Sequence, residues 1–506
     1  MKRTKKLPQK KLANKSDVAS KSGEATSPTQ TGQEQIRTVQ QAIDSAVQHH
    51  QAGDLPKAET IYQQILQANP NQPIALHFLG LLAHQVGKND IAFNLISKAL
   101  TIKPDYAEAH CNLGIVLKVL AKINEAVACY SKAIAIKPDY AEAHYNLGNS
   151  FRSLGKFDEA MTCYIKAINI KPDYAEAYLN LGVALQKLGR SDEAVKNFRK
   201  AIDVKPDYTD AHSNHGTALH ELGKLDEAVA SYNKAIAIKP DLAEAHFNLH
   251  ALVLDPNDIT ASINHIRKSV DIEPFNNLYR FTLGTLLDYT GNFQEATTHF
   301  EIVKTGEDID RARLDAWHYI KSINNKIPTV IGSSIQAFEV GIKASAKKGL
   351  VMEFGVRFGT SIRQIAALAK QEVHGFDSFE GLPEAWDNEP KGSYSTEGAI
   401  PLVPDNVTLH KGWFEETLPN FVAHHQGPVR FMNIDCDIYS STKTIFNLLA
   451  KQITHGTIIV FDEYIGNTNW REDEFKAFQE AVLSNGWKYE YLCFSFFTKQ
   501  VVIRIS

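Results

Sequence analysis

The sequence predicts a protein of two parts, an all-α superhelix of repeated helical pairs followed by an α/β domain on a mostly parallel sheet. Three observations lead to this fold class. The chain has 506 residues, too many for one hydrophobic core. A pattern with a period of 34 residues runs through more than half of it. Short apolar segments then alternate with helical ones to the C-terminal end.

The composition is that of an ordinary globular protein, with 43% hydrophobic and 22% charged residues. A net charge of -4 gives no general attraction for nucleic acid. The five cysteines are scattered, without the close pairs of a zinc site or a disulfide framework. No apolar run approaches the ~18–20 residues that cross a bilayer, and no signal segment follows the basic start. We therefore expect a cytoplasmic protein without a membrane span.

Residues 1–35 are rich in Lys, Ser, Thr and Gln and nearly free of large apolar side chains. Such a segment buries too little surface to offset the entropy of ordering, so we expect a disordered basic tail. The rest of the chain is predicted to divide into repeats (36–307), a helical linker (308–348) and the α/β domain (349–506).

The phrase KPDYAEAH begins at Lys103 and Lys137 and returns in altered form at Lys171, Lys205 and Lys239. Glycine and alanine series with the same step fall on the two predicted helices of each unit, where small residues let paired helices approach closely. A further glycine series lies between the helices, where a turn needs positive φ. It consists of Gly53, Gly87, Gly155, Gly189, Gly223 and Gly291. Each unit is therefore predicted as helix, turn, helix.

This pattern resembles the tetratricopeptide repeat, with about eight units. The resemblance implies a superhelix whose concave face binds a protein or peptide partner. The unit from Pro240 to Glu273 departs most, because His250 stands where the glycine belongs and Ser262 where the alanine belongs. We expect this unit to be a distorted repeat.

An asparagine recurs at one position of five first helices, at Asn112, Asn146, Asn180, Asn214 and Asn248. A ladder of amides could hold an extended peptide backbone by hydrogen bonds. It resembles the asparagine ladder in the repeat domain of O-GlcNAc transferases. The alternative is that asparagine is common at this repeat position, and both interpretations remain open.

In the second part we expect strands at 350–355, 373–377, 407–411, 429–435, 457–462, 489–494 and 500–505. Strands that alternate with helices indicate an open sheet with helices on both faces. Such sheets bind ligands at the carboxyl ends of their strands.

The first of these strands ends in EFGVRFGTS, which places Glu353, Gly355 and Gly359 at a strand-to-helix turn. The second ends at Asp377, where a carboxylate can accept hydrogen bonds from both ribose hydroxyls of a nucleoside. Together they indicate an adenosine-containing ligand, in a dehydrogenase or a methyltransferase. The GxxxG spacing, the acids after the fourth strand and the late strand pair favour a Rossmann-like methyltransferase that uses S-adenosylmethionine. Glu353 would then approach the amino group of its methionine part.

The segments DSFEGLPEAW, GWFEETLP, NIDCDIYSST and FDEYIG resemble the macrocin O-methyltransferase family of metal-dependent sugar methyltransferases. The resemblance implies Asp435, Asp462 and Glu463 as Mg²⁺ ligands, with Asp437 as the alternative for one of them. The family usually has two aspartates where this chain has Asp462 and Glu463. Cofactor contacts are expected from Glu353, Gly355, Gly359, Ser361, Asp377, Ser378, Phe379 and Trp413.

Methyl transfer to a hydroxyl requires that its proton be lost, and Mg²⁺ held by carboxylates stabilises the resulting alkoxide. Asp435 and Asp437 are the first candidates for the base, and His410 and His455 the second. These loop acids could instead cap helices or stay solvated.

Residues 384–403 are predicted to form a lid. Aromatic rings that could cover a sugar, or else pack in the core, are Trp386, Tyr439, Tyr464 and Trp470.

The leading hypothesis is an S-adenosylmethionine- and Mg²⁺-dependent O-methyltransferase that acts on a sugar-like hydroxyl, with repeats that recruit the acceptor or a protein. The alternative is a non-catalytic repeat scaffold with a vestigial methyltransferase domain. A repeat-containing glycosyltransferase has support only from the repeats.

Overall fold

The structure, a computed structural model, describes residues 29–323 and 327–506. Residues 1–28 of the predicted tail lie outside the described residues. The described chain forms two compact units, which divide between Ala184 and Leu185.

The first unit consists of helical pairs. Its helices are α1 (Thr29–Gln51), α2 (Leu55–Ala68), α3 (Pro73–Gln85), α4 (Asn89–Ile102), α5 (Ala107–Val119), α6 (Ile123–Ile136), α7 (Ala141–Ser153), α8 (Phe157–Ile170) and α9 (Ala175–Lys187), which ends in the second unit. Helices α1 to α8 form four packed pairs, and each of these pairs packs on the next. Helix α1 starts earlier than the predicted repeats, within the segment expected to be tail.

Small residues in the first helices permit this packing. A Cβ on Gly114 of α5 would lie 2.6 Å from the ring of Tyr130 on α6, and one on Gly148 would lie 2.7 Å from Tyr164. All six turn glycines have positive φ. Two units lack a turn glycine, and in the first of them Ala121 adopts φ 60° instead.

The second unit continues with helical pairs. Its repeat helices are α10 (Ser191–Val204), α11 (Thr209–Glu221), α12 (Leu225–Ile238), α13 (Ala243–Leu252), α14 (Thr260–Ile272), α15 (Asn277–Tyr289) and α16 (Phe293–Val303), followed by α17 (Asp308–Ser322). The irregular unit forms the pair α13–α14, in which α13 is short and a bridge between Asp255 and Asp258 shapes the connection.

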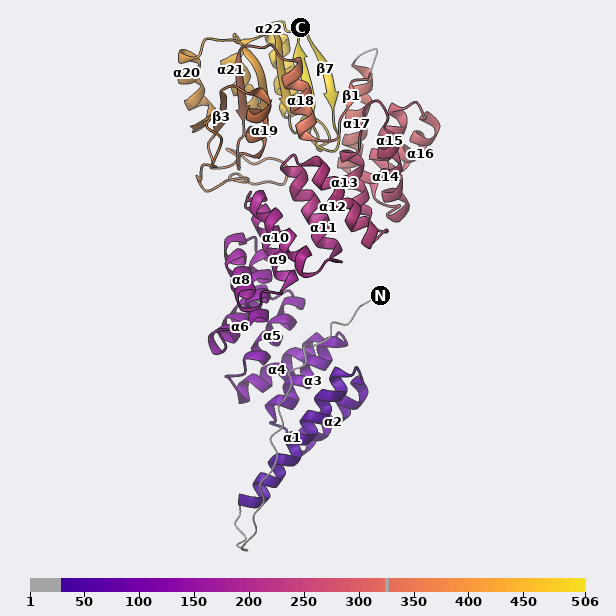
Figure 1. The fold of residues 1–506 in the computed structure, drawn as a ribbon, viewed down its shortest axis with the longest axis vertical. Coiled ribbons are helices and arrows are strands. Elements are labelled where there is room, and N and C mark those ends of the chain that lie inside the picture. The colour runs from indigo at the N-terminus through magenta and orange to yellow at the C-terminus, as the bar shows by residue number, and fades with distance from the viewer. Residues whose placement is uncertain (1–28, 324–326) are drawn as a thin grey trace. The chain divides into compact units, whose positions relative to one another are not determined.

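An eight-stranded sheet follows in the same unit (Figure 1). Its strands are β1 (Thr329–Val330), β2 (Leu350–Phe354), β3 (Val373–Asp377), β4 (Val407–Lys411), β5 (Val429–Ile434), β6 (Ile453–Phe461), β7 (Tyr489–Phe494) and β8 (Val501–Ile505). The order across the sheet is β1-β7-β8-β6-β5-β2-β3-β4, and only β8 is antiparallel to its neighbours. The carboxyl ends of β2, β3, β4, β5 and β6 therefore meet at one edge.

Helices cover both faces, as the alternation predicted. They are α18 (Ser334–Ala344), α19 (Thr360–Ala369), α20 (Phe414–His424), α21 (Tyr439–Leu449) and α22 (Glu474–Asn485). Val351 and Phe431 point to the core beneath α18 and α19, whereas their neighbours Met352 and Met432 belong to the core beneath α20, α21 and α22. No helix in the described parts of the chain is both long and apolar enough to cross a membrane.

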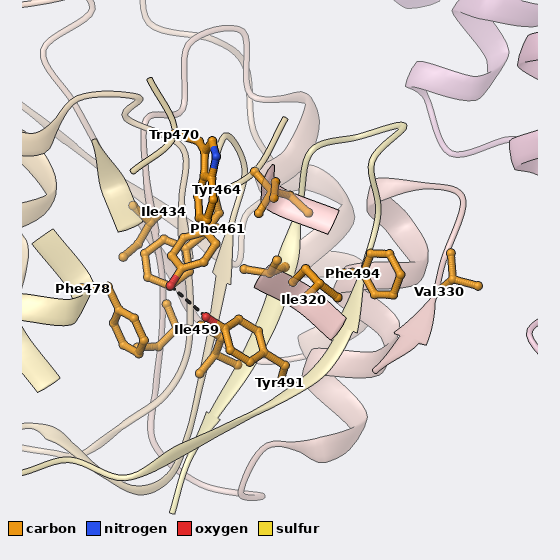
Figure 2. Packing of buried hydrophobic residues seen from close by; sticks show 14 of the residues in the cluster. Ile320, Val330, Ile434, Ile459, Phe461, Tyr464, Trp470, Phe478, Tyr491 and Phe494 are labelled. Atoms are coloured by element: carbon orange, nitrogen blue, oxygen red, sulfur yellow. Dashed lines mark hydrogen bonds between the residues drawn. The ribbon is translucent and has the colours of Figure 1, made fainter. Parts of the chain in front are cut away.

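The second of these cores also contains the last repeats. Trp317 and Ile320 of α17 are fully buried together with Phe494 of β7 (Figure 2). The Trp317 indole donates a 2.7 Å hydrogen bond to the Asp288 carboxylate on α15. Residues 308–348, expected to be a helical linker, thus supply α17, β1 and α18 to this unit, and α17 shares a core with repeat and sheet.

Candidate functional site

A cavity of about 450 Å³ lies at the carboxyl-end edge of the sheet. The loops after five parallel strands and the segment from Gly381 to Tyr394 line it. Eight of the predicted site residues are among its lining residues: Gly355, Asp377, Ser378, Trp413, Asp435, Asp437, Asp462 and Glu463. Glu353, Gly359, Ser361 and Phe379 do not contribute to this lining. The structure therefore brings most of the predicted site together at one place.

The turn after β2, residues 355–359, is called the glycine loop below. Gly355 has φ 90°, and a Cβ there would lie 1.7 Å from the carbonyl oxygen of Asp435, so only glycine fits. Asp377 Oδ2 accepts hydrogen bonds from the backbone N–H groups of Val356 (2.8 Å) and Arg357 (2.7 Å). Its Oδ1 accepts one from the N–H of Phe379 (2.6 Å). Asp377 thus fixes the loop as well as facing the cavity.

Glu353 lies at the end of β2 and is fully buried. Its Oε1 accepts a 2.9 Å hydrogen bond from the Asn433 amide on the adjacent β5, and Ser361 also bonds to it. Burial raises the pKa of Glu353 to about 8. Its Oε2 has no partner among the described residues. A cationic group that reached this oxygen would relieve the cost of its burial.

Asp435, Asp437 and Asp462 follow β5 and β6, which are neighbours in the sheet. Burial and mutual repulsion raise the pKa of all three carboxyls. Asp437 adopts φ 64°, a conformation that costs energy for any residue with a side chain. Arg357 and Lys499 partly offset the repulsion at Asp437. Buried acids of this kind are either proton acceptors or cation ligands in functional sites.

Glu463 is already paired. The Lys499 ammonium donates to both of its oxygens, at 3.1 and 2.9 Å, and the Gln500 amide donates to Asp462. Within the described residues, no group of three or more His, Cys, Asp or Glu side chains is arranged so that it could hold a metal ion. The donor chemistry nevertheless fits Mg²⁺, because the acids offer hard oxygens whose mutual repulsion a divalent cation would relieve.

Several residues at the site were not anticipated. Arg357 and Tyr394 line the cavity, with the guanidinium 5.0 Å from the Tyr394 ring. Glu474, the first residue of α22, is fully buried, and burial together with repulsion from Asp437 raises its pKa well above the ordinary value. Asn433 alone gave a signal in the sequence, as an amide inside an apolar strand.

The second-choice bases lie elsewhere. His410 stacks on the ring of Phe376, with centroids 4.5 Å apart, and burial lowers its pKa. His455 lies near the start of β6, opposite the edge that carries the cavity. Both are therefore packing or surface residues at positions unsuited to the proton acceptor.

Of the four aromatic candidates, only Trp386 lines the cavity. Tyr464 and Trp470 are buried in the core shared with α17 (Figure 2), where the Tyr464 hydroxyl lies 3.0 Å from that of Tyr491. Tyr439 donates to Glu480 at 2.7 Å. Tyr464 and Trp470 therefore pack in the core, as the alternative had it, whereas Tyr439 is half-buried and bonds outside the core.

The segment expected to be a lid, residues 384–403, forms one wall of the cavity through Trp386 and Tyr394. The Trp386 indole donates to Asp473 at 3.1 Å, and the Arg363 guanidinium donates to the carbonyl of Leu402 at 3.0 Å. Both ends of the segment are thus anchored to the body of the domain.

The asparagine series lies within the repeats, and its members are half-buried. The amide of Asn112 donates to His77 at 2.8 Å, and the amide of Asn180 to Tyr145 at 3.0 Å and Asn149 at 2.8 Å. These bonds join two of the units to the preceding ones. The amides of Asn112 and Asn180 therefore contribute to the stacking of the repeats, and the binding of a peptide backbone by the series stays a prediction.

Comparison with known families agrees with this architecture. Residues 352–464 match a family model described as a methyltransferase domain. Models described as TPR repeat or tetratricopeptide repeat match residues 122–151, 148–189, 175–208 and 216–255. The chain therefore consists of tetratricopeptide repeats joined to a methyltransferase domain, as predicted, and the narrower resemblance to the macrocin O-methyltransferase family stays a prediction.

Among curated proteins, the chain is similar to the 8-demethyl-8-(2,3-dimethoxy-alpha-L-rhamnosyl)-tetracenomycin-C 4'-O-methyltransferase of Streptomyces olivaceus, with 29% identity over 148 residues. The match covers 24% of this chain and 56% of that protein, so the chain spans about half the length of this curated relative.

Two solved structures are similar to the repeats. A crystal structure of MamA is 32% identical, with a TM-score of 0.30, and covers 32% of this chain and 94% of that one. YrrB, described as a TPR protein with an unusual peptide-binding site, is 24% identical, with a TM-score of 0.33, and covers 36% of this chain and 95% of that one.

Proposed function

We propose that the protein is an S-adenosylmethionine-dependent O-methyltransferase that acts on a sugar-like hydroxyl with the help of Mg²⁺, and that its repeats bind a protein partner or the acceptor. One observation carries the proposal. The glycine loop, the Asp377 carboxylate and three half-buried aspartates face one cavity at the carboxyl ends of parallel strands. The rhamnosyl group in the name of the curated relative motivates the choice of a sugar-like acceptor.

Asp377 and Glu353 are assigned to the cofactor. Asp377 Oδ1 accepts one backbone hydrogen bond, and a carboxylate oxygen can accept a second from a ribose hydroxyl. Glu353 Oε2 would receive the amino group of the methionine part, which gives this buried acid the cation that it lacks. Bare backbone at Gly355 lets the ligand approach the end of β2.

The aspartates are assigned to the acceptor. Asp437 or Asp435 would take the proton of the acceptor hydroxyl while the acceptor oxygen forms its bond to the methyl carbon, and the carbon–sulfur bond breaks with its electron pair on sulfur. A raised pKa suits a carboxylate to this task, because proton transfer is most effective from a group whose acidity is close to the working pH.

Asp435, Asp462 and Glu463, with Asp437 as the alternative, are the proposed ligands of Mg²⁺, which would stabilise the developing alkoxide when bound. Glu463 could take part only if the Lys499 ammonium moved away, because that ammonium contacts both of its oxygens. Asp437 has no such competitor at ion-pair distance among the described residues and could replace Glu463 as a ligand, but it would then no longer be free to act as the base.

Calorimetric titration with S-adenosylhomocysteine and S-adenosylmethionine, with and without Mg²⁺, tests the proposal. We expect saturable binding to the wild type and binding at least about tenfold weaker in Asp377→Ala, since a charged hydrogen bond contributes ~1.5–3 kcal/mol. Asp405→Ala, which removes an exposed carboxylate before β4, is the control and should bind normally.

The alternative, a repeat scaffold with a vestigial methyltransferase domain, predicts that the wild type binds neither S-adenosylmethionine nor S-adenosylhomocysteine. A wild-type protein that bound neither compound under any condition would exclude the enzyme. If binding were observed, methyl transfer from labelled S-adenosylmethionine to a panel of glycosides would identify the acceptor class.

A further inference from the structure

The glycine loop contacts the repeats through Phe358. The ring packs against the turn between α9 and α10, where Gly189 has φ 69°. A Cβ on Gly189 would lie 1.9 Å from Phe358 Cγ, far inside the contact distance of two carbon atoms. The equivalent turn of the next repeat, between α11 and α12, makes a second contact, since a Cβ on Gly223 would lie 3.0 Å from Ile335 on α18. Two successive repeat turns thus touch the methyltransferase domain.

A hydrogen bond supports the same junction. Gln364, in the first half of α19, donates from its amide to the carbonyl of Glu221 at 2.9 Å. Glu221 is the last residue of α11, where helix carbonyls lack an intrahelical partner. Helix α19, which begins at the glycine loop, therefore supplies a hydrogen-bond donor to a carbonyl at the C-terminal end of the repeat helix α11.

On its other side the loop is held by Asp377, whose carboxylate accepts hydrogen bonds from the backbone N–H groups of Val356 and Arg357. Arg357 has φ 46°, a strained conformation for a residue with a side chain, which must be maintained by its surroundings. Its guanidinium lies 4.7 Å from the centroid of the Phe358 ring. The loop is accordingly fixed between a carboxylate of the sheet and a glycine turn of the repeats.

We propose that Phe358 is a positioning residue. Its ring packs on the Gly189 turn, and this contact holds the glycine loop in place, so that the repeats set the affinity of the loop for the cofactor. This inference rests on the proposed use of S-adenosylmethionine. It gives the repeat array a role at the methyltransferase site that differs from recruitment of a partner.

Gly189→Ala is a direct test, because the clash falls on Cγ. Rotation of a phenyl ring about its own axis does not move Cγ, so the side chain must change its χ1 angle or the loop must shift. Gly155 is a matched control at the equivalent turn of the preceding unit, with φ 73° and no atom within 4 Å of a built Cβ. Gly155→Ala therefore introduces the same backbone strain without the contact.

We expect Gly189→Ala to bind S-adenosylhomocysteine about tenfold more weakly than the wild type, as overpacking of a fixed contact displaces the loop. Gly155→Ala should bind like the wild type, and it should lose less thermal stability than Gly189→Ala because it has the backbone strain without the clash. In the double variant Gly189→Ala/Phe358→Ala the clash is absent, so its affinity should equal that of Phe358→Ala alone.

Equal affinity in Gly189→Ala and the wild type would overturn the inference, because the ring would then have moved without consequence for the loop. If Gly189→Ala did not fold, Phe358→Ala and Phe358→Leu would decide. Binding weakened by alanine and restored by leucine supports the positioning role, and unchanged binding in both refutes it. A wild-type protein that bound no cofactor would instead refute the proposed function, and this inference with it.

Discussion

Glu353 combines complete burial with a polar environment of only two side chains, Asn433 and Ser361. Its pKa of about 8 exceeds the ordinary 4.5, so the folded state binds this proton more tightly than the unfolded state does. Between these values the folded protein holds more protons, and stability falls as pH rises from about 4.5 to about 8.

Glu353→Gln should abolish this fall in stability with rising pH, because glutamine resembles the protonated acid and does not ionise. We expect the variant to be more stable than the wild type at pH 8.5 and similar to it at pH 4.5, with stability measured by urea denaturation. Glu301→Gln, at an exposed position, should shift the midpoint little at either pH. A variant that was less stable at pH 8.5 would show that the ionised carboxylate is stabilised by the fold.

Lys499 competes with any cation for Glu463. If Glu463 is a ligand of Mg²⁺, Lys499→Met should tighten Mg²⁺ binding about threefold or more, since a partly exposed ion pair contributes up to ~1 kcal/mol. Calorimetric titration with MgCl₂ measures this change. Lys476→Met, which breaks an ion pair with Glu472 on the surface, is the control. Weaker or unchanged binding in Lys499→Met would exclude Glu463 as a ligand.

At the scale of the elements, one repeat turn is strained. Ala121 adopts φ 60° where six other units have glycine, and the left-handed region costs a residue with a Cβ ~1–2 kcal/mol. Ala121→Gly relieves this cost but gives the unfolded chain more freedom, worth ~0.4–1 kcal/mol. We expect a net stabilisation of about 0.5–1 kcal/mol.

Circular dichroism during urea denaturation would detect this effect as a higher midpoint for the helical signal. Gly155→Ala should lower the midpoint, since it introduces the same strain at an equivalent turn. Equal midpoints for Ala121→Gly and the wild type would mean that the turn relaxes without cost.

Local pattern was sufficient to predict the seven longer strands, to within a few residues at their ends, because each is a short apolar run between turn signals. Strand β1 was missed. It has only two residues, Thr329 and Val330, and exists through pairing with β7, which lies far along the sequence. The start of β6 was placed late because the polar segment Thr454–Gly456 interrupts its apolar pattern.

The candidate site divides in the same way. Strand-end acids such as Asp377 and Asp435 were predicted at the cavity because parallel strands bring their carboxyl ends together. The partners of these acids could not be predicted, since Lys499 reaches Glu463 from a turn 36 residues away. The contact of Phe358 with Gly189 could not be predicted either, because it depends on how a repeat turn packs against the methyltransferase domain.

At the scale of the second unit, the last repeats and the sheet are one folded structure. A chain that begins at Asp308 would lack α15, whose Leu283, Leu286 and Leu287 are buried in the shared core. We expect this fragment to be insoluble or to bind a hydrophobic dye, with no cofactor binding. A fragment that begins at Lys137 retains every helix of the second unit and should bind the cofactor like the full chain.

A soluble Asp308 fragment with normal cofactor affinity would contradict this view and would restore the helical-linker interpretation. The departures of the irregular repeat agree with a shared structure. His250 packs against Phe497 of the β7–β8 connection, with ring centroids 5.6 Å apart, and a Cβ on Gly332 would lie 1.8 Å from the carbonyl oxygen of Ala251. One of the two residues that break the repeat pattern, His250, therefore contacts the methyltransferase domain.

The position of β8 in the sheet also bears on the order in which the chain can fold during synthesis. β8 ends at Ile505 and lies between β7 and β6, and β1 pairs only with β7. Until β8 has left the ribosome the sheet is incomplete, and the apolar surface of α17 that contacts Phe494 lacks a stable cover. Ribosome-bound chains that lack β8 should therefore carry an exposed hydrophobic face on completed repeats, a surface suited to chaperones.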